Sequence, residues 1–336
     1  MKGVKLAVLA ALAGAWLAGC GGEEVKTPPE NYTVKIPGSD IEFEMVYVPG
    51  GEFVMGSPEA EAKRAEDEGP QRKVRVKPYW IGQTEVTWEM YEQYAFVKDP
   101  SMLEAISIAS PKINLDYGLK FWSWLKLQYK LAFNEQLDAI TKPSPYYGDY
   151  YHGMGRGKKP AIGLSRLNAD IFCLWLSKKT GQHFRLPTDA EWEYAARAGS
   201  QETSYGGESG LEDYAWFERN SDFETMEVAT RKPNAWGLYD MLGNVWEFCF
   251  DYYDPDYFKK LKPDKVNVEP EGPEESREVK TSLRGGSWDD FAEELRVANR
   301  LEQLDWWNER DPQRPRGAWW LVDGNVVGFR LARSAE

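Results

Sequence analysis

The chain has 336 residues, a formal net charge of −13, two histidines and three cysteines. A site of three histidines cannot form, and a structural zinc site would use nearly every histidine and cysteine. The acidic balance excludes the basic stripe that a nucleic-acid-binding protein needs, so we expect no nucleic-acid partner. The length suffices for one large core or two domains. With 15 Trp, 18 Tyr and 14 Phe, packing around large rigid rings is favoured.

Residues 1–19 have the features of a lipoprotein signal peptide. Lys2 and Lys5 precede an apolar stretch, residues 6–18. That stretch is too short to cross a bilayer, which takes about 20 helical residues. It ends at Leu17-Ala18-Gly19-Cys20, which resembles a bacterial lipobox with Cys20 as the lipidated residue. An ordinary cleaved signal with an accidental cysteine is the alternative.

The residues after Cys20 predict where the protein is anchored. Gly21 follows the cysteine, and by resemblance to such lipoproteins the absence of Asp there favours the outer membrane. Residues 20–40 are rich in Gly, Pro and charge, which is typical of a flexible tether. We therefore expect a protein of the bacterial cell envelope, extracytoplasmic and held to the membrane by lipid.

Residues 41–336 are predicted to form one α+β domain with a helical and aromatic insert at about 98–160. Alternating or short apolar runs predict strands at Met45–Val48, Phe53–Met55, Arg72–Lys77 and Tyr79–Gly82. Apolar residues at helical spacing predict helices at Thr84–Val97, Leu119–Ile140 and Leu167–Lys178. The remainder has the pattern of short strands and long loops, with strand candidates at Gly237–Phe248, Leu283–Trp288, Leu295–Arg300 and Gly328–Arg333. Many short strands with few helices exclude a doubly wound α/β sheet.

One short helix has strong local signals at both ends. Thr188 is followed three residues later by Glu191, which is the spacing of a capping box. Gly199 stands where the residue after a helix C-terminus belongs. These signals predict a helix over about residues 189–198.

A set of blocks resembles, in the same order, the formylglycine-generating enzyme family, also called the sulfatase-modifying factor domain. The blocks are Met45–Ser57, Gln83–Thr87, Phe184–Gly199, Asn234–Phe248, Arg284–Trp288 and Gly328–Arg333. Any one block is a weak signal, but the ordered set is specific and spans about residues 41–335. The resemblance implies the C-type-lectin-like fold of that family, which is α+β with short strands, few helices and long loops.

The resemblance also implies a copper site that this chain lacks. Enzymes of the family hold copper with two cysteines just after the block Arg284–Trp288. Those positions are here Asp290 and about Leu295, and no cysteine follows Cys249. Cu(I) requires soft thiolates, so we expect no copper, no catalytic residue and no formylglycine formation. The iron site of the family's ergothioneine branch needs three histidines and is excluded.

A structural calcium site is implied by the same resemblance. Its ligands would be the side chains of Asp240 and Glu247 with the carbonyls of Gly243 and Val245. Ca²⁺ takes six to eight oxygen ligands, and this block supplies carboxylates and a turning chain. The alternative is that Asp240 caps a turn and Glu247 pairs with an arginine. A second calcium site of the family is not predicted here, because Trp216 stands where a side-chain oxygen belongs.

The remaining cysteines and the histidines leave alternatives open. Cys173 and Cys249 are interpreted as small buried hydrophobic residues, with a mutual disulfide or a catalytic or metal role as alternatives. His183 is expected to pack or to bond the backbone, and His152 to lie at the surface.

Aromatic clusters are the other functional hint, although core packing explains many of them. They are Tyr146, Tyr147, Tyr150 and Tyr151 in the insert, and Trp306, Trp307, Trp319 and Trp320, which are interspersed with Arg310, Arg314 and Arg316. Tyr, Trp and Arg dominate binding hot spots. By resemblance, Trp246 and Ser287 line the family's substrate groove. With Trp288 and Asp290 they are our candidate binding residues.

These observations predict a binding or assembly module, braced by calcium, that recognises a protein, peptide or glycan partner at the envelope. The alternative is an oxidase or protein-modifying enzyme of the same family that uses a different metal site. Fold alone does not separate the two functions.

Overall fold

The computed structural model describes residues 29–95, 149, 151–206, 210–272, 280–305 and 324–335. The predicted signal peptide, Cys20 and the predicted helix Leu119–Ile140 lie outside the described residues. So do Tyr146, Tyr147, Tyr150 and the candidate aromatic and arginine residues between Trp306 and Trp320. Within the described ranges, the helices are too short or too polar to cross a membrane.

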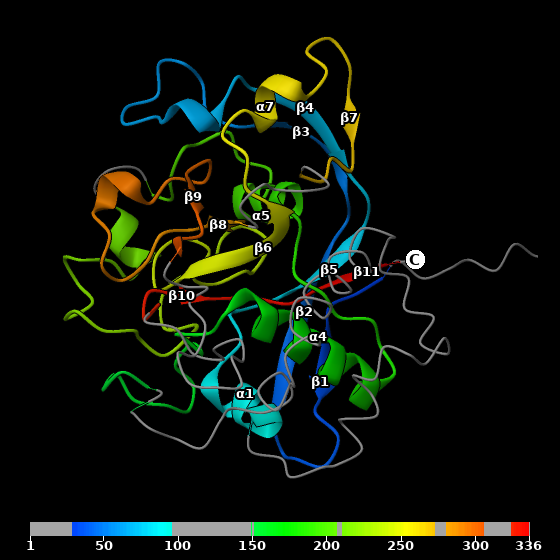
Figure 1. The fold of residues 1–336 in the computed structure, drawn as a ribbon, viewed down its shortest axis with the longest axis vertical. Coiled ribbons are helices and arrows are strands. Elements are labelled where there is room, and N and C mark those ends of the chain that lie inside the picture. Colours follow the sequence, from blue (N-terminus) through cyan, green and yellow to red (C-terminus); the bar gives the residue numbers. More distant parts are fainter. Residues whose placement is uncertain are drawn as a thin grey trace, which may run out of the picture.

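Three small sheets form the β part of the fold (Figure 1). The first has the order β1-β2-β5-β11, with the strands Tyr32–Lys35, Glu42–Val48, Tyr79–Gly82 and Ala332–Ser334. The second has the order β10-β6-β8-β9, with the strands Val327–Gly328, Trp246–Tyr252, Thr281–Arg284 and Arg300–Glu302. The third has the order β3-β4-β7, with the strands Gly51–Met55, Arg72–Val76 and Asn267–Val268.

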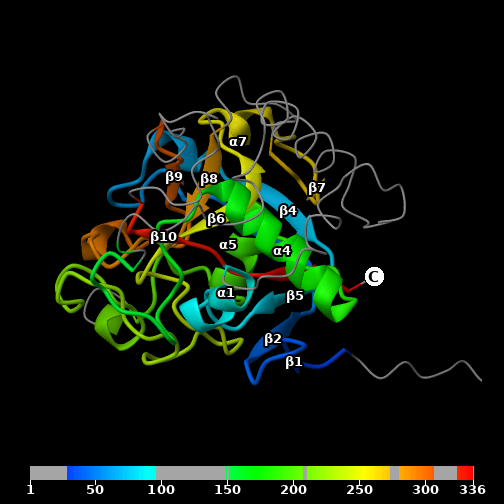
Figure 2. The ribbon, with the colours of Figure 1, turned by 60° about the horizontal axis from the view of Figure 1, so that its bottom comes forward.

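The helices of the described residues are few and mostly short. The α-helices are α1 (Trp88–Ala95), α4 (Arg166–Thr180), α5 (Asp189–Arg197) and α7 (Tyr257–Lys260). Single 3₁₀ turns lie at η1 (Glu66–Glu68), η2 (Leu211–Asp213) and η3 (Ala292–Glu294). Figures 1 and 2 show α1 beside α4, and α5 in the middle of the molecule near β6 and β8. The predicted α+β class is confirmed.

Local capping chemistry places α5 as the sequence predicted. Thr188 Oγ1 accepts the Glu191 amide proton at 3.1 Å, and Glu191 Oε2 accepts that of Thr188 at 2.8 Å. The helix ends at Ala198 and Gly199, whose φ angles of +45° and +84° stop the helical hydrogen-bond pattern. Because both caps are satisfied by neighbouring residues, this element was predictable without tertiary information.

The predicted helix Thr84–Val97 begins later than expected, at Trp88. Val86 is held extended, because its amide donates to Phe329 O and its carbonyl accepts from Ala161 N, each at 2.8 Å. These long-range bonds compete with the helical bonds that the same groups would otherwise make. The tertiary pairing therefore shortens the helix.

Predicted strands near the candidate site are also shorter, for a different reason. The run Gly237–Phe248 becomes a strand only at Trp246, since Asp240, Gly243 and Asn244 have φ angles of +52°, +79° and +58°. Left-handed residues cannot continue a β-ladder. The run Leu283–Trp288 ends its strand at Arg284, where two glycines with positive φ follow.

Three other predictions of extent are corrected. The run Leu295–Arg300 is mainly turn and contributes only Arg300 to β9. The run Gly328–Arg333 divides between β10 and β11, which belong to different sheets. Strand β1 lies inside the stretch 20–40 predicted as tether and pairs with β2, so regular structure is present from Tyr32.

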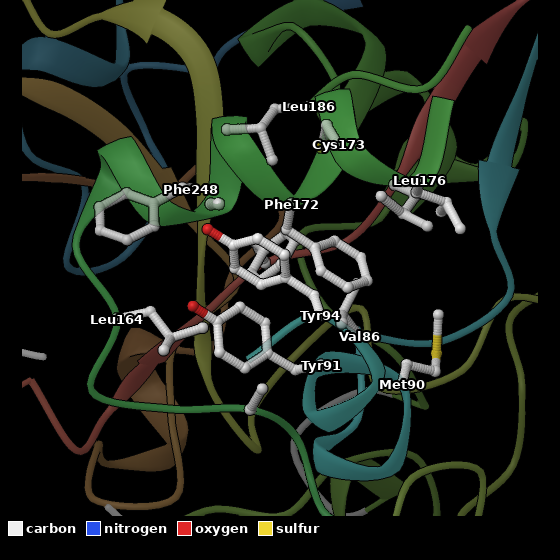
Figure 3. Close-up of a cluster of buried hydrophobic side chains, with 14 of the residues drawn as sticks. Val86, Met90, Tyr91, Tyr94, Leu164, Phe172, Cys173, Leu176, Leu186 and Phe248 are labelled. Atoms are coloured by element: carbon white, nitrogen blue, oxygen red, sulfur yellow. The ribbon is translucent and has the colours of Figure 1, made fainter. Parts of the chain in front are cut away.

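Aromatic rings fill the larger of the two hydrophobic clusters (Figure 3). Phe172 of α4 lies 5.6 Å from the ring of Tyr91 and 5.5 Å from that of Trp175, measured between centroids. Tyr94 and Phe329 complete the contacts of this ring. The core therefore depends on rigid rings from α1 and α4, as the composition indicated.

Candidate functional site

The candidate site is formed by two turns held against each other by backbone hydrogen bonds. One turn, residues 240–245, precedes β6, and the other, residues 285–290, follows β8. Gly243 N donates to Gly285 O at 3.0 Å, and Trp288 N donates to Asn244 O at 2.9 Å. Because β6 and β8 are antiparallel neighbours, the two sequence blocks that carry the candidate residues meet in space.

Glycine is required where these turns pass close to the rest of the chain. A Cβ atom on Gly243 would lie 2.2 Å from the carbonyl oxygen of Trp216, and the φ angle of Gly243 is +79°. Any side chain there would displace the backbone. The close approach fixes the position of the turn that carries Asp240 and Asn244.

Of the four predicted binding residues, Trp246 and Ser287 meet at the carboxylate of Asp290. Trp246 Nε1 donates to Asp290 Oδ2 at 2.7 Å. Ser287 donates to the same oxygen from its amide at 2.7 Å and from its hydroxyl at 2.6 Å. Trp288 points its indole N–H elsewhere, to Asn325 O at 3.1 Å. Trp246, Ser287 and Trp288 are buried, so among the four only the half-buried Asp290 offers a charged group at the surface.

Asp290 and Leu295, which stand about where the resemblance places the family's copper cysteines, also lie close together. A Cβ atom on Gly286 would lie 3.1 Å from Leu295 Cδ1 and 3.9 Å from Asp290 Oδ2, so both side chains approach one point. Leu295 is fully buried. Burial raises the pKa of Asp290, and the hydrogen bonds from Ser287 oppose that shift. This point of the structure therefore brings together a carboxylate and a buried aliphatic side chain.

The carboxylate of Glu247, a predicted calcium ligand, is engaged by other side chains. It accepts two hydrogen bonds from Arg330, at 2.6 Å from Nε and 2.5 Å from Nη2, and a third from Trp192 Nε1 at 2.7 Å. A bidentate arginine pair of this kind is a strong, charge-assisted interaction. The structure thus shows for Glu247 the arginine pairing that the sequence left open as its alternative.

Asp240 and Glu85 each have one carboxylate oxygen that accepts a hydrogen bond and one that does not. Asp240 Oδ2 accepts from Ala229 N at 2.8 Å, and Glu85 Oε1 accepts from Asn244 Nδ2 at 3.0 Å. The other oxygen of each is buried and has no hydrogen-bond partner in the part of the chain that the structure describes. Burial raises the pKa of Asp240 to about 6. Burial and the nearby Asp240 raise the pKa of Glu85 well above its usual range.

Sequence reasoning missed Glu85, although its block Gln83–Thr87 was noted. Its signal is an acidic residue in an otherwise apolar and threonine-rich stretch, which becomes informative only when burial is known. The described residues contain no group of three or more His, Cys, Asp or Glu side chains placed to hold a metal. A cation here would therefore depend on two carboxylates and on backbone carbonyls.

Trp216 stands where a second calcium site would need a side-chain oxygen. Its indole ring instead stacks with an arginine and donates a hydrogen bond. The Arg231 guanidinium lies over its ring at 3.5 Å from the centroid, and its indole N–H donates to Thr230 Oγ1 at 2.9 Å. Stacking of this kind stabilises the loop through a cation–π contact.

The disulfide left open by the sequence does not form. Cys173 and Cys249 are both buried and free, and burial raises the pKa of each thiol well above its usual range. Inaccessible neutral thiols are poor nucleophiles. His183 is exposed, so the packing predicted for it is wrong, whereas His152 is half-buried with a φ angle of +51°.

Comparison with known proteins agrees with this architecture. Residues 37–335 match the family model described as a sulfatase-modifying factor enzyme 1-like domain. The chain is 29% identical over 322 residues to a formylglycine-generating enzyme of Streptomyces coelicolor, covering 87% of this chain and 89% of that protein. It is 26% identical over 235 residues to the inactive C-alpha-formylglycine-generating enzyme 2 of Mus musculus, covering 63% and 70%.

A solved structure gives the same result for the fold. Treponema denticola variable protein 1 superposes with a TM-score of 0.60 at 23% identity, covering 91% of this chain and 99% of that one. The chain belongs to the formylglycine-generating enzyme, or sulfatase-modifying factor, family. The C-type-lectin-like fold predicted from the ordered sequence blocks is confirmed.

Proposed function

We propose that this protein is a binding or assembly module that does not generate formylglycine. The observation that carries the proposal is the pair of side chains beside Gly286. At the two positions where the family's enzymes hold copper, the chain has the carboxylate of Asp290 and the buried aliphatic chain of Leu295. Oxygen donors and hydrocarbon do not replace thiolates for Cu(I).

The surroundings of Asp290 support a binding role. Its Oδ2 is held by three donors from Trp246 and Ser287. A carboxylate fixed in this way loses little further freedom when a ligand binds, which favours affinity. The fold of the family thus holds a preorganised carboxylate, Asp290, at the position inferred for a copper-binding cysteine.

An oxidation assay tests the proposal. We expect the full chain, purified in detergent and supplied with Cu(I) and a sulfatase-type cysteine peptide, to consume no oxygen above the buffer rate and to form no aldehyde. The S. coelicolor formylglycine-generating enzyme is the positive control under the same conditions. Peptide-dependent oxygen consumption with aldehyde formation would refute the proposal.

A calcium brace is the second part of the proposal. The buried, unpartnered oxygens of Asp240 and Glu85 fit a hard cation that prefers carboxylate and carbonyl ligands. We propose that Asp240, Glu85 and the carbonyls of Gly243 and Val245 hold calcium, while Glu247 stays paired with Arg330. Such an ion offsets the buried negative charge and stiffens the turn that positions Trp246.

Removal of calcium should lower thermal stability. A ligand that binds only the folded state stabilises it by about 2.7 kcal/mol when its concentration is 100 times Kd. We therefore expect the melting temperature of the full chain to fall when EGTA replaces calcium. The variant Asp240→Asn/Glu85→Gln should show no calcium dependence.

The matched control for that variant is Glu212→Gln/Asp213→Asn, which changes two exposed acids that pair with Arg219 and Lys232. It should keep the calcium response of the parent protein. The calcium brace would be ruled out by a parent melting temperature that is unchanged by EGTA, or by a full response in Asp240→Asn/Glu85→Gln.

The proposed setting is the bacterial envelope, with Cys20 as the lipid attachment site and a protein, peptide or glycan as partner. The lipobox and the tether composition support this setting, and the negative charge argues against nucleic acid. The alternative is an enzyme of the family that uses a different metal site, and the oxidation assay described above separates it from the binding role.

A further inference from the structure

Two exposed phenylalanines lie on segments joined to the turn that carries Asp290. In the described part of the chain, the large hydrophobic side chains that are exposed are Phe223 (65%), Phe291 (58%) and Val268 (55%). Phe291 follows Asp290 directly. The loop of Phe223 is tied to the same turn, because Ser221 Oγ donates to Trp288 O at 2.9 Å. In Figures 1 and 2 the yellow-green loops and the orange turn with η3 lie on the same side of the molecule. Both exposed rings therefore stand on segments that are hydrogen-bonded to each other, and an exposed apolar surface of this kind can mark an interaction site.

The backbone holds this arrangement in place. Glu218 N donates to Asp290 O at 3.0 Å, which adds a second bond between the two segments. Asp222 and Phe223 have φ angles of +52° and +61°, a conformation that side chains other than glycine seldom adopt. Phe223 is therefore presented to solvent by a defined turn.

The charge beside these rings is negative and uncompensated. Asp222 and Asp289 are exposed and have no ion-pair partner among the described residues. Glu293, at the edge, is neutralised by Lys63 at 2.7 Å. Carboxylates next to aromatic faces attract cations through charge and through the ring quadrupole.

Asp290, which directly precedes Phe291, has one carboxylate oxygen that accepts no hydrogen bond from the described residues. All three of its hydrogen bonds reach Oδ2, from Trp246 and Ser287. Oδ1 accepts none from the described residues, and it is not one of their fully buried, unpartnered atoms, so it keeps some access to solvent. The carboxylate is fixed by one oxygen and open at the other.

We propose that the surface formed by Asp222, Phe223, Asp289, Asp290 and Phe291, named the Phe223–Phe291 face, binds an arginine- or lysine-containing segment of a partner protein. A guanidinium or ammonium donates to Asp290 Oδ1, and the two rings cover its apolar stem. The net charge of −13 speeds encounter with a cationic partner. This inference rests on the proposed binding function and names the chemistry of its partner.

Fluorescence anisotropy with the full chain in detergent tests the inference. The probe is a labelled peptide in which arginine alternates with serine, and matched peptides carry glutamine or glutamate in place of arginine. We expect the arginine peptide to bind most tightly and to weaken as salt rises. Asp290→Asn should weaken it about tenfold, which corresponds to about 1.4 kcal/mol. Phe223→Ser/Phe291→Ser should weaken it to a similar extent.

The control is Asp40→Asn, which removes one exposed carboxylate paired with Lys35 on the distant β1–β2 turn. It should leave affinity within about twofold, since its charge lies beyond a Debye length of about 8 Å. Unchanged melting temperatures establish that the variants are folded. Equal binding of arginine and glutamine peptides, no binding at all, or insensitivity to Asp290→Asn would overturn the inference. The proposed function fails separately, through aldehyde formation in the oxidation assay.

Discussion

Replacing Arg284 by methionine is expected to remove about 3–5 kcal/mol from the free energy of unfolding. Arg284 is fully buried and pairs with Asp189 through Nε and with Glu193 through Nη2, the latter at 2.9 Å. Its Nη1 also donates to Val297 O at 3.1 Å. Methionine fills a similar volume but leaves two carboxylates with less positive charge in a medium that solvates charge poorly. Urea unfolding followed by tryptophan fluorescence measures the loss.

A surface pair provides the matched control for this substitution. Arg219 pairs with Glu212 at 3.1 Å, with both side chains more than half exposed. Arg219→Met should cost less than about 1 kcal/mol, because an exposed pair gains little over hydration. Equal losses for Arg284→Met and Arg219→Met would contradict the view that α5 is joined to β8 by a buried ion-pair network.

Replacing Phe172 by alanine is expected to cost about 3–5 kcal/mol through loss of burial and creation of a cavity. The ring is fully buried and contacts the rings of Tyr91, Tyr94, Trp175 and Phe329 (Figure 3). These rings are rigid and are fixed by α1, by α4 and by the segment between β10 and β11, so they cannot collapse readily into the space. Thermal and urea unfolding should show the loss together.

Phe223→Ala is the control for the aromatic core, since Phe223 is 65% exposed. It should change stability by no more than about 0.5 kcal/mol. Phe172→Leu should lose less than Phe172→Ala, because leucine keeps part of the buried volume. If Phe172→Ala and Phe223→Ala were equally stable, the packing shown in Figure 3 would not be the source of stability.

Sequence reasoning succeeded where the hydrogen bonds that begin or end an element come from residues close to it in the sequence. The capping box of Thr188 and Glu191 placed α5, and the strand β5 at Tyr79–Gly82 agrees at both ends. It failed where distant segments compete for the backbone, as at Val86, whose hydrogen bonds to Phe329 and Ala161 replace a helical start.

For the candidate site, the sequence predicted which residues lie together better than it predicted which of them are exposed. Trp246 and Ser287 meet at Asp290, but both are buried. No motif indicated the exposed Phe223 and Phe291 of the proposed face. Exposure of a single phenylalanine leaves no periodic signal in a turn. Glu85 was missed because its burial is not visible in the local sequence. It is buried against a distant segment, the turn that contains Asp240 and Asn244.

The sequence by itself determined the family, the α+β class and the absence of any cysteine after Cys249, because these depend on residue identity and order alone. The tertiary structure decided how the carboxylates are used. It pairs Glu247 with Arg330 and leaves single oxygens of Asp240 and Glu85 buried without partners. It also directs all three hydrogen bonds of the Asp290 carboxylate to Oδ2 and leaves Oδ1 without a donor among the described residues. The physical reason is that a carboxylate's role depends on its desolvation and on the donors within hydrogen-bond reach, which come from segments far apart in the chain.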